Sequence, residues 1–319
     1  MKKKLTLLSI VSPTFNEEEN INELYRRVKH TIKKLNKYQF EFIFIDNAST
    51  DNTIPLLRKI SAKDKNVKVI INNRNFGHIR SPYYGILQSK GEATIYLASD
   101  LQDPPELISE FIKEWELGNN LVLAVKSFSE GSKFMHALRK LYYRMLGKIS
   151  DVSIVNDSTG FGLYDKKIIN QLRKLDEPYP FLRGLLCELG YEPKKIIFKQ
   201  AKRIGGLTKN NFYTLYDIGM LGIVNHSKVP IRLAAFLGFI IGFLSMFIGI
   251  IFIILKLIYW NSFPLGTAPL IIGIFFLIGL LLFFLGVLGE YIGSIHNYMQ
   301  KRPLVVEKER INFKKNEDV

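Results

Sequence analysis

Two long apolar segments near the C-terminus constrain the architecture of this chain most strongly. Residues 233–255 and 269–289 contain no charged side chain, and each matches the roughly 20 residues that a helix needs to cross the hydrocarbon core of a bilayer. The connection between them carries one lysine, whereas basic residues lie outside both segments: Lys228, Arg232, Lys301, Arg302, Lys308 and Arg310. Because loops rich in Lys and Arg stay in the cytoplasm, we expect a multi-pass protein of the inner (plasma) membrane with both termini in the cytoplasm.

These segments divide the chain into four predicted parts. The parts are a cytoplasmic globular domain (1–210), an amphipathic juxtamembrane segment (211–231), two transmembrane helices within 232–293 (about 233–256 and 269–290) and a basic cytoplasmic tail (294–319). The chain has 44 Lys and Arg against 29 Asp and Glu, a formal net charge of +15. Such a charge suits nucleic acid, an anionic membrane surface or phosphorylated ligands. The apolar segments favour the membrane, so no nucleic-acid partner is expected.

Upstream of the apolar segments, short β-rich runs alternate with helical stretches. The predicted strands are 5–12, 40–45, 67–71, 93–97 and 121–125, and the predicted helices are 18–37, 53–62, 77–90 and 105–117. This alternation is typical of an α/β fold with a mostly parallel central sheet. The apolar run after the N-terminal lysines is therefore predicted to be a strand. A signal peptide is disfavoured, because no small-residue cleavage site follows that run.

Polar and acidic residues follow four of the predicted strands, in residues 12–18, 46–53, 72–80 and 98–106. Because ligands bind beyond the carboxyl ends of parallel strands, we expect these segments to form one site. None of them contains the glycine pattern of a dinucleotide-binding loop or of a P-loop. A dehydrogenase and an ATPase are therefore disfavoured.

The strongest signal in these segments is A-S-D-L-Q-D-P-P-E at residues 98–106. Asp100 and Gln102 alternate onto one side of an extended segment, so they can share a hard divalent cation, which prefers oxygen ligands and bridges to phosphate oxygens. Taken alone, this segment could equally be a solvated turn before a helix. The run D-N-A-S-T-D-N-T at 46–53 has short side chains suited to hydrogen-bonding a ligand, or to capping a helix.

The order P-T-F-N-E, D-N-A-S-T-D-N-T and S-D-L-Q-D-P-P-E resembles the family-two glycosyltransferases of the GT-A fold, over nearly the whole chain. With two C-terminal spans and R-I-G-G-L-T-K at residues 203–209, the chain is most similar to bactoprenol glucosyltransferases and dolichyl-phosphate mannose synthases. The resemblance implies inverting transfer of a sugar from a nucleotide diphosphate sugar, such as a UDP-hexose, to polyprenyl (undecaprenyl) phosphate. It also implies Mg²⁺ or Mn²⁺ as the cofactor.

The resemblance further implies roles for individual residues. The expected nucleotide-sugar ligands are Pro13, Asn16, Glu17, Asp46, His78, Asp100, Arg203 and Lys209. Asp100 and Gln102 are expected to bind the metal, and Arg139 and Arg144 the acceptor phosphate. Asp157 and Asp100 are the expected catalytic residues, Asp157 by orienting the acceptor. A general base is not required, because an alkyl phosphate is already largely dianionic at neutral pH.

Two positions depart from the family pattern. Ala98 stands at the first position of the Asp-x-Asp motif of many relatives, and T-G-F-G-L at 159–163 stands where bactoprenol glucosyltransferases often have G-D-F-R-L. These departures leave open a catalytically silent membrane scaffold that binds nucleotide sugars. A polysaccharide synthase is another alternative, although the chain lacks a Q-x-x-R-W motif. Gly238 and Gly242 have the small-xxx-small spacing of helix pairs, which makes a homo-oligomer a further expectation.

Overall fold

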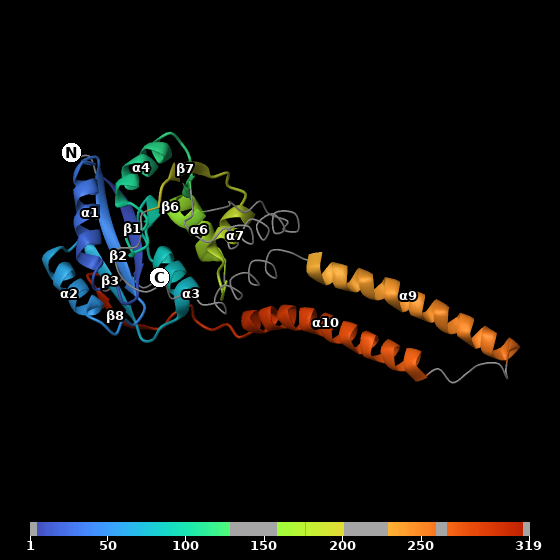
Figure 1. Cartoon of the computed structure of the whole chain (residues 1–319). Helices are drawn as coiled ribbons and strands as arrows, with labels where there is room; N and C mark the ends of the chain where they lie inside the picture. Colours follow the sequence, from blue (N-terminus) through green and yellow to red (C-terminus); the bar gives the residue numbers. More distant parts are fainter. Residues whose placement is uncertain (1–4, 128–157, 176, 201–228, 260–266, 315–319) are drawn as a thin grey trace.

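The structure is a computed structural model that describes residues 5–127, 158–175, 177–200, 229–259 and 267–314. In this part of the chain an eight-stranded sheet has the order β7-β5-β6-β4-β1-β2-β3-β8 (Figure 1). The strands are β1 (Thr6–Thr14), β2 (Tyr38–Asp46), β3 (Val67–Asn72), β4 (Ala93–Tyr96), β5 (Leu121–Lys126), β6 (Ser158–Asp165), β7 (Lys194–Phe198) and β8 (Glu307–Ile311). The first four strands are parallel to one another, whereas β6 and β8 run antiparallel to their neighbours. The predicted α/β fold with a mostly parallel sheet is confirmed.

Helices cover both faces of this sheet. They are α1 (Ile21–Lys33), α2 (Thr53–Lys63), α3 (Gly77–Leu87), the 3₁₀ turn η1 (Pro105–Leu107), α4 (Ile108–Glu116), α6 (Lys166–Lys174) and α7 (Leu182–Glu188). One apolar core lies under α1, α2 and α4, and the other lies under α3, α6 and α7. In β2, Phe42 and Phe44 enter the first core, while Ile43 and Ile45 enter the second. Burial on both faces explains why this strand is a continuous apolar run.

The C-terminal segment returns to the sheet after the second long helix. β8 pairs antiparallel with β3 at the edge of the sheet, and Arg310 donates hydrogen bonds to Tyr84 Oη (3.1 Å) and Gln88 Oε1 (2.9 Å) on α3. The side chain of Asn312 donates to the carbonyl oxygens of Ser61 and Val67. Sequence patterning predicted a basic tail here and did not predict this strand, because the short charged run E-K-E-R-I has no apolar alternation.

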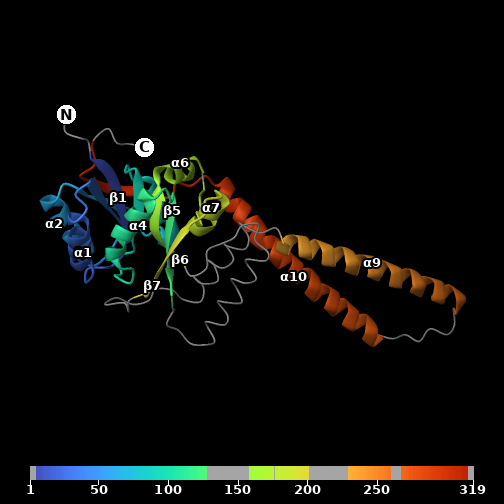
Figure 2. The ribbon, with the colours of Figure 1, turned by 90° about the horizontal axis from the view of Figure 1, so that it is seen from above.

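Two long helices, α9 (Val229–Ile258) and α10 (Thr267–Met299), project away from the sheet (Figures 1 and 2). Their domain-proximal ends are the start of α9 and the end of α10. Among the described residues, Phe276–Met299 has a mean hydropathy of 2.1 and is long and apolar enough to cross a membrane by length and composition, and Val229–Leu244 is a shorter apolar stretch. Large apolar side chains are exposed along both helices, as for Phe239 (79%) and Phe276 (68%). These helices therefore present an apolar surface that water would not cover favourably.

Candidate active site

The four polar segments meet at the carboxyl edge of β1, β2, β3 and β4, where the parallel register brings Thr14 beside Asp46. Three non-glycine residues in these loops have left-handed backbone conformations, namely Asn16 (φ 55°), Ala48 (φ 61°) and Leu101 (φ 58°). Each such conformation costs free energy and persists only where its surroundings enforce it. Their occurrence in three neighbouring loops marks this edge as a candidate functional site.

Asp46, at the end of β2, is fully buried. Its carboxylate accepts hydrogen bonds from Thr14 Oγ1 (3.0 Å), Ser49 N (2.9 Å) and Ser49 Oγ (2.6 Å). Burial raises the pKa of this carboxyl, while the hydrogen bonds from Ser49 and Thr14 oppose that rise. The predicted nucleotide-binding residue Asp46 therefore also holds the β1 and β2 loops together.

The loop after β1 is bound to the loop after β2 by further hydrogen bonds. Asn16 N donates to Ser49 Oγ (2.9 Å), and Thr50 N donates to Asn16 Oδ1 (2.8 Å). Glu17 N donates to Thr53 Oγ1 (2.8 Å), while the Glu17 carboxylate accepts from Asn20 Nδ2 (2.6 Å). Pro13 ends the apolar part of β1, and its carbonyl accepts from Ser99 Oγ (2.6 Å). Pro13, Asn16, Glu17 and Asp46 thus lie in one hydrogen-bonded assembly.

Asn47 connects this assembly to the loop after β3, which sequence reasoning did not predict. Its Nδ2 donates to Asn75 Oδ1 (2.9 Å) and to Gly77 O (3.1 Å). Its Oδ1 accepts from Asn72 Nδ2 (3.1 Å) and Phe76 N (2.9 Å). The amide is nearly buried, at 6% exposure. The run of short polar side chains at 46–53 was the only sequence signal for this role, and it did not distinguish Asn47 from its neighbours.

The loop after β4 carries the predicted metal ligands. Asp100 and Gln102 are half-buried, and Gln102 N donates to Asp100 Oδ1 (3.2 Å). Ser99 fixes the start of the loop, because its hydroxyl lies 2.8 Å from Ser12 Oγ and also donates to Pro13 O. No group of three or more His, Cys, Asp or Glu side chains in the described residues could hold a metal by itself. One carboxylate and one amide oxygen suit Mg²⁺ or Mn²⁺ when substrate phosphates and water supply the other ligands.

A small pocket lies beside this loop, with a volume of about 120 Å³. His78, Tyr96, Gly160 and Arg183 are among its lining residues. Burial raises the pKa of the Tyr96 hydroxyl, Asp103 and Asp100 raise it further, and Arg183 lowers it. His78, which is exposed at the start of α3, shares this pocket with Tyr96 and Arg183. Tyr96 and Arg183 are site residues that sequence reasoning missed, because a single Tyr in a strand and a single Arg in a helix carry no motif.

The two glycines that depart from the family pattern have different surroundings. A Cβ at Gly160 would lie 3.8 Å from Tyr164 Oη and 3.9 Å from the Tyr96 ring, although its φ of +89° favours glycine. A Cβ at Gly162 would lie 2.2 Å from Val122 O on β5. Gly162 is therefore required by close strand pairing in this chain, whereas Gly160 leaves space at the pocket.

The other predicted site residues lie outside the described residues. They are Asp157, Arg139, Arg144, Arg203 and Lys209. The described residues therefore bring together Pro13, Asn16, Glu17 and Asp46 in one assembly and Asp100 and Gln102 in one loop, while His78 lines the pocket with Tyr96. The five outside residues stay predictions.

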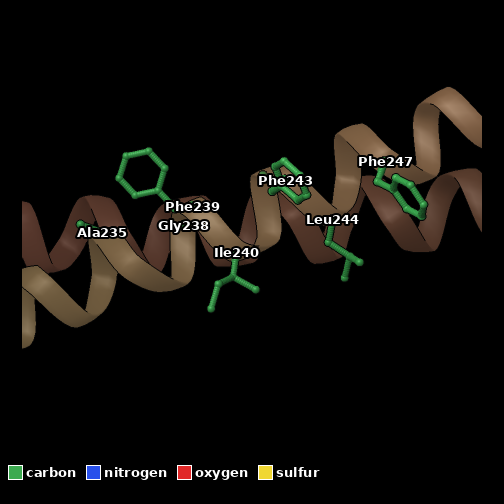
Figure 3. A pocket seen from close by; sticks show the side chains of 8 residues that line it. Ala235, Gly238, Phe239, Ile240, Phe243, Leu244 and Phe247 are labelled. Atoms are coloured by element: carbon green, nitrogen blue, oxygen red, sulfur yellow. The ribbon is translucent and has the colours of Figure 1, made fainter.

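A larger apolar hollow lies on α9, away from this edge (Figure 3). The described residues that line it are all apolar, including Gly238, Phe239 and Phe243. Substrate-binding pockets combine apolar walls with a few placed polar groups, and the described lining of this hollow has no polar side chain. We therefore assign the candidate site to the sheet edge.

Comparison with known proteins agrees with this geometry. Residues 9–173 match the family described as Glycosyl transferase family 2. An uncharacterized glycosyltransferase of Bacillus subtilis, YkcC, is 36% identical over 93% of this chain and 92% of its own length. The prophage-derived bactoprenol glucosyl transferase of Shigella flexneri is 31% identical over 94% of this chain and 97% of its own length.

A solved structure of the mannosyltransferase PcManGT from Pyrobaculum calidifontis, in complex with GDP-Man and Mn²⁺, aligns with a TM-score of 0.47. The identity is 15%, and the alignment covers 72% of this chain and 65% of that one. This likeness is too low to carry an argument about ligands. The family match covers the strands and loops that build the site, and the relatives extend it over nearly the whole chain. The chain is a glycosyltransferase and belongs to glycosyl transferase family 2.

Proposed function

We propose that this protein transfers a sugar, with inversion, from a nucleotide diphosphate sugar to polyprenyl phosphate at the cytoplasmic surface of the membrane. The observation that carries the proposal is that Ser99 joins the hydrogen-bonded assembly around Asp46 to the half-buried Asp100–Gln102 loop at one sheet edge. The acceptor class rests on the bactoprenol glucosyl transferases, which are about 31% identical over most of the chain. UDP-glucose or another UDP-hexose is the donor that we would test first.

The β1–β2 loops and the β4 loop would bind different parts of the donor, the nucleoside and the diphosphate. In this proposal the assembly of Pro13, Asn16, Glu17 and Asp46 would shape the nucleoside site. Asp100 and Gln102, which are hydrogen-bonded within one loop, would face the diphosphate. Arg203 and Lys209 would close over the phosphates, and Arg139 and Arg144 would bind the acceptor phosphate. A divalent cation held by Asp100 and Gln102 would neutralise charge on the diphosphate.

The reaction is a single displacement. An acceptor phosphate oxygen forms a bond to the anomeric carbon while the bond from that carbon to the diphosphate oxygen breaks. The electron pair leaves with the nucleoside diphosphate, and no proton transfer is needed to balance the step. Asp157 would orient the acceptor. The groups around the leaving diphosphate accelerate the step because charge develops there in the transition state.

We also propose that α9 and α10 both span the membrane, with the sheet domain and both termini in the cytoplasm. The apolar surfaces of the two helices, and their domain-proximal ends on one side, support this topology. The Gly238–Gly242 face of α9 would be open to a second copy, since an added Cβ at either glycine meets nothing within 4 Å. To test the topology, Cys187 is replaced by Ala, and single cysteines at residue 262 and at the exposed position 308 are labelled from each side of sealed vesicles. Opposite accessibility is expected.

The direct test of the function uses purified full-length protein in detergent with undecaprenyl phosphate, Mg²⁺ or Mn²⁺ and a panel of nucleotide sugars. A lipid-linked monosaccharide, detected by mass spectrometry and absent with Asp100→Ala, is the expected result. Nucleotide binding without any product would favour the catalytically silent scaffold. Long polymer would favour a polysaccharide synthase.

A further inference from the structure

Three arginines gather where α10 reaches the sheet domain. Arg74 lies in the loop after β3, Arg80 lies on α3, and Arg302 lies three residues beyond the end of α10. Arg80 donates a hydrogen bond through Nη2 to the carbonyl oxygen of Pro303, the residue that follows Arg302. The guanidinium groups of Arg74 and Arg80 lie 4.1 Å and 5.8 Å from the centre of the Phe76 ring. We call these three residues the arginine cluster.

The charge of the arginine cluster is not balanced within the described part of the chain. None of its three members forms an ion pair with a carboxylate there, although other arginines such as Arg27, Arg58 and Arg310 do. Burial lowers the pKa of Arg80, and the positive charges of Arg74 and Arg302 lower it further, while Tyr179 opposes them. Like charges brought together in this way repel one another, so the arrangement is costly without an anion.

Arg80 also has an unused donor. Its Nε atom is buried and has no hydrogen-bond partner among the described residues. A buried donor without a partner costs free energy that a bound acceptor would recover. Arginine presents its donors in a planar fork, which matches the oxygens of a phosphate group. The unbalanced charge and the unused donor therefore both favour a phosphate as the ligand.

The position of the cluster identifies the source of that phosphate. Arg302 follows the apolar segment Phe276–Met299, which is long enough to cross a membrane, so the cluster lies where headgroups lie if α10 spans the bilayer. Arg74 and Arg302 are exposed and accessible to such a headgroup. We propose that Arg74, Arg80 and Arg302 bind the phosphate group of a membrane lipid at the end of α10. This inference goes beyond sugar transfer and needs only the membrane position of α10.

Two lipids share this chemistry, a bulk anionic phospholipid and the polyprenyl phosphate acceptor. The full-length protein in a neutral detergent is titrated with phosphatidylglycerol, phosphatidylcholine or undecaprenyl phosphate, and bound lipid is counted by native mass spectrometry. The test variant is Arg74→Gln/Arg302→Gln, which leaves the Arg80 contact with Pro303 intact. The control is Arg26→Gln, an exposed arginine on α1 that pairs with Glu23.

The wild type is expected to bind at least one of the two anionic lipids more tightly than phosphatidylcholine, whose phosphate is neutralised by its own choline. A basic residue near an anionic lipid surface contributes enough for about a fivefold change in affinity, so the double variant should lose about 25-fold. If the double variant loses affinity for phosphatidylglycerol alone, the cluster binds bulk phospholipid. If it loses affinity for undecaprenyl phosphate alone, the cluster binds the acceptor. Loss of affinity for both lipids indicates a shared phosphate site. Arg26→Gln should retain wild-type binding.

Three results would overturn the inference. The first is equal binding of the two anionic lipids by the wild type and the double variant, and the second is an equal loss of lipid binding in Arg26→Gln. The third is a double variant that keeps lipid binding and loses UDP binding in a parallel UDP titration, which would assign the cluster to the donor. Failure of the wild type to transfer sugar would contradict the proposed function but not this lipid site. The two proposals are therefore tested separately.

Discussion

Two carboxylates at the same edge of the sheet have opposite surroundings. Asp46 is fully buried and accepts hydrogen bonds from Thr14 and Ser49. Asp100 is half-buried, and Gln102 N is its hydrogen-bond donor within its own loop. The β2 loop is thus part of the folded core, whereas the β4 loop leaves its carboxylate partly exposed. We expect changes at Asp46 to alter stability and changes at Asp100 to alter chemistry.

The largest effect should come from Asp100→Asn. Removing one group that stabilises developing charge lowers turnover by about 100-fold to 1,000-fold. Stability should change by less than about 0.5 kcal/mol, since Gln102 N, which donates to Asp100 Oδ1, can donate to the amide oxygen of Asn instead. Initial rates and thermal unfolding of the same preparation measure both quantities. Glu106→Gln, in the same segment but exposed, is the control, and Asp100→Asn with more than a tenth of wild-type activity would contradict the assignment.

Asp46→Ala should lower the free energy of unfolding more than Asp100→Asn does. The buried hydroxyl of Thr14 and the part-buried donors of Ser49 lose their acceptor, and loss of the acceptor of a buried donor costs about 1–3 kcal/mol. Nucleotide affinity should fall as well, because the same loop forms the proposed nucleoside pocket. Thermal unfolding and UDP titration measure the two effects, with Glu92→Ala, an exposed carboxylate, as the control. If Asp46→Ala were as stable as the wild type, the proposed structural role of the β2 loop would be contradicted.

The pH dependence of the free energy of unfolding tests the burial of Asp46 directly. Burial raises the pKa of Asp46 above its ordinary value of 3.8, so the protonated carboxyl is favoured in the folded state. The stability that this proton contributes is fully present below about pH 3.8 and is lost as pH rises through the raised pKa. Subtracting the unfolding profile of Asp46→Asn from that of the wild type should isolate this loss. A difference profile that stays flat, or that rises with pH, would contradict the pKa shift.

The smallest effect should come from Ser99→Ala. Ser99 binds the start of the metal loop to Ser12 and to Pro13 O, and a single hydrogen bond contributes about 0.5–1.5 kcal/mol. Turnover should fall much less than in Asp100→Asn, because the carboxylate itself remains. Rates and unfolding midpoints are compared with those of Ser12→Ala. A loss as large as that of Asp100→Asn would mean that loop position, and not the carboxylate, limits the reaction.

Much of the candidate site could be predicted from the sequence because each of its loops is a short, contiguous stretch of chain. The five predicted strands, the loop runs at 46–53 and 98–106 and the helix start at Pro105 all appear where the chain pattern indicated. The roles of Asn47, Tyr96 and Arg183 could not be predicted, since each depends on contacts with distant segments. Asp157, Arg139, Arg144, Arg203 and Lys209 stay predictions from the resemblance.

The sequence by itself determined the α/β alternation, the carboxyl-edge loops and the long apolar helices, because strand period, turn residues and hydropathy act over short stretches of chain. Only the tertiary structure decided the antiparallel insertion of β6, the return of β8 to the sheet edge and the gathering of the arginine cluster. These features join residues separated by up to hundreds of positions, as for Arg80 and Pro303. The strand pairings and the Arg80–Pro303 hydrogen bond in these features join distant residues, so no local pattern encodes them.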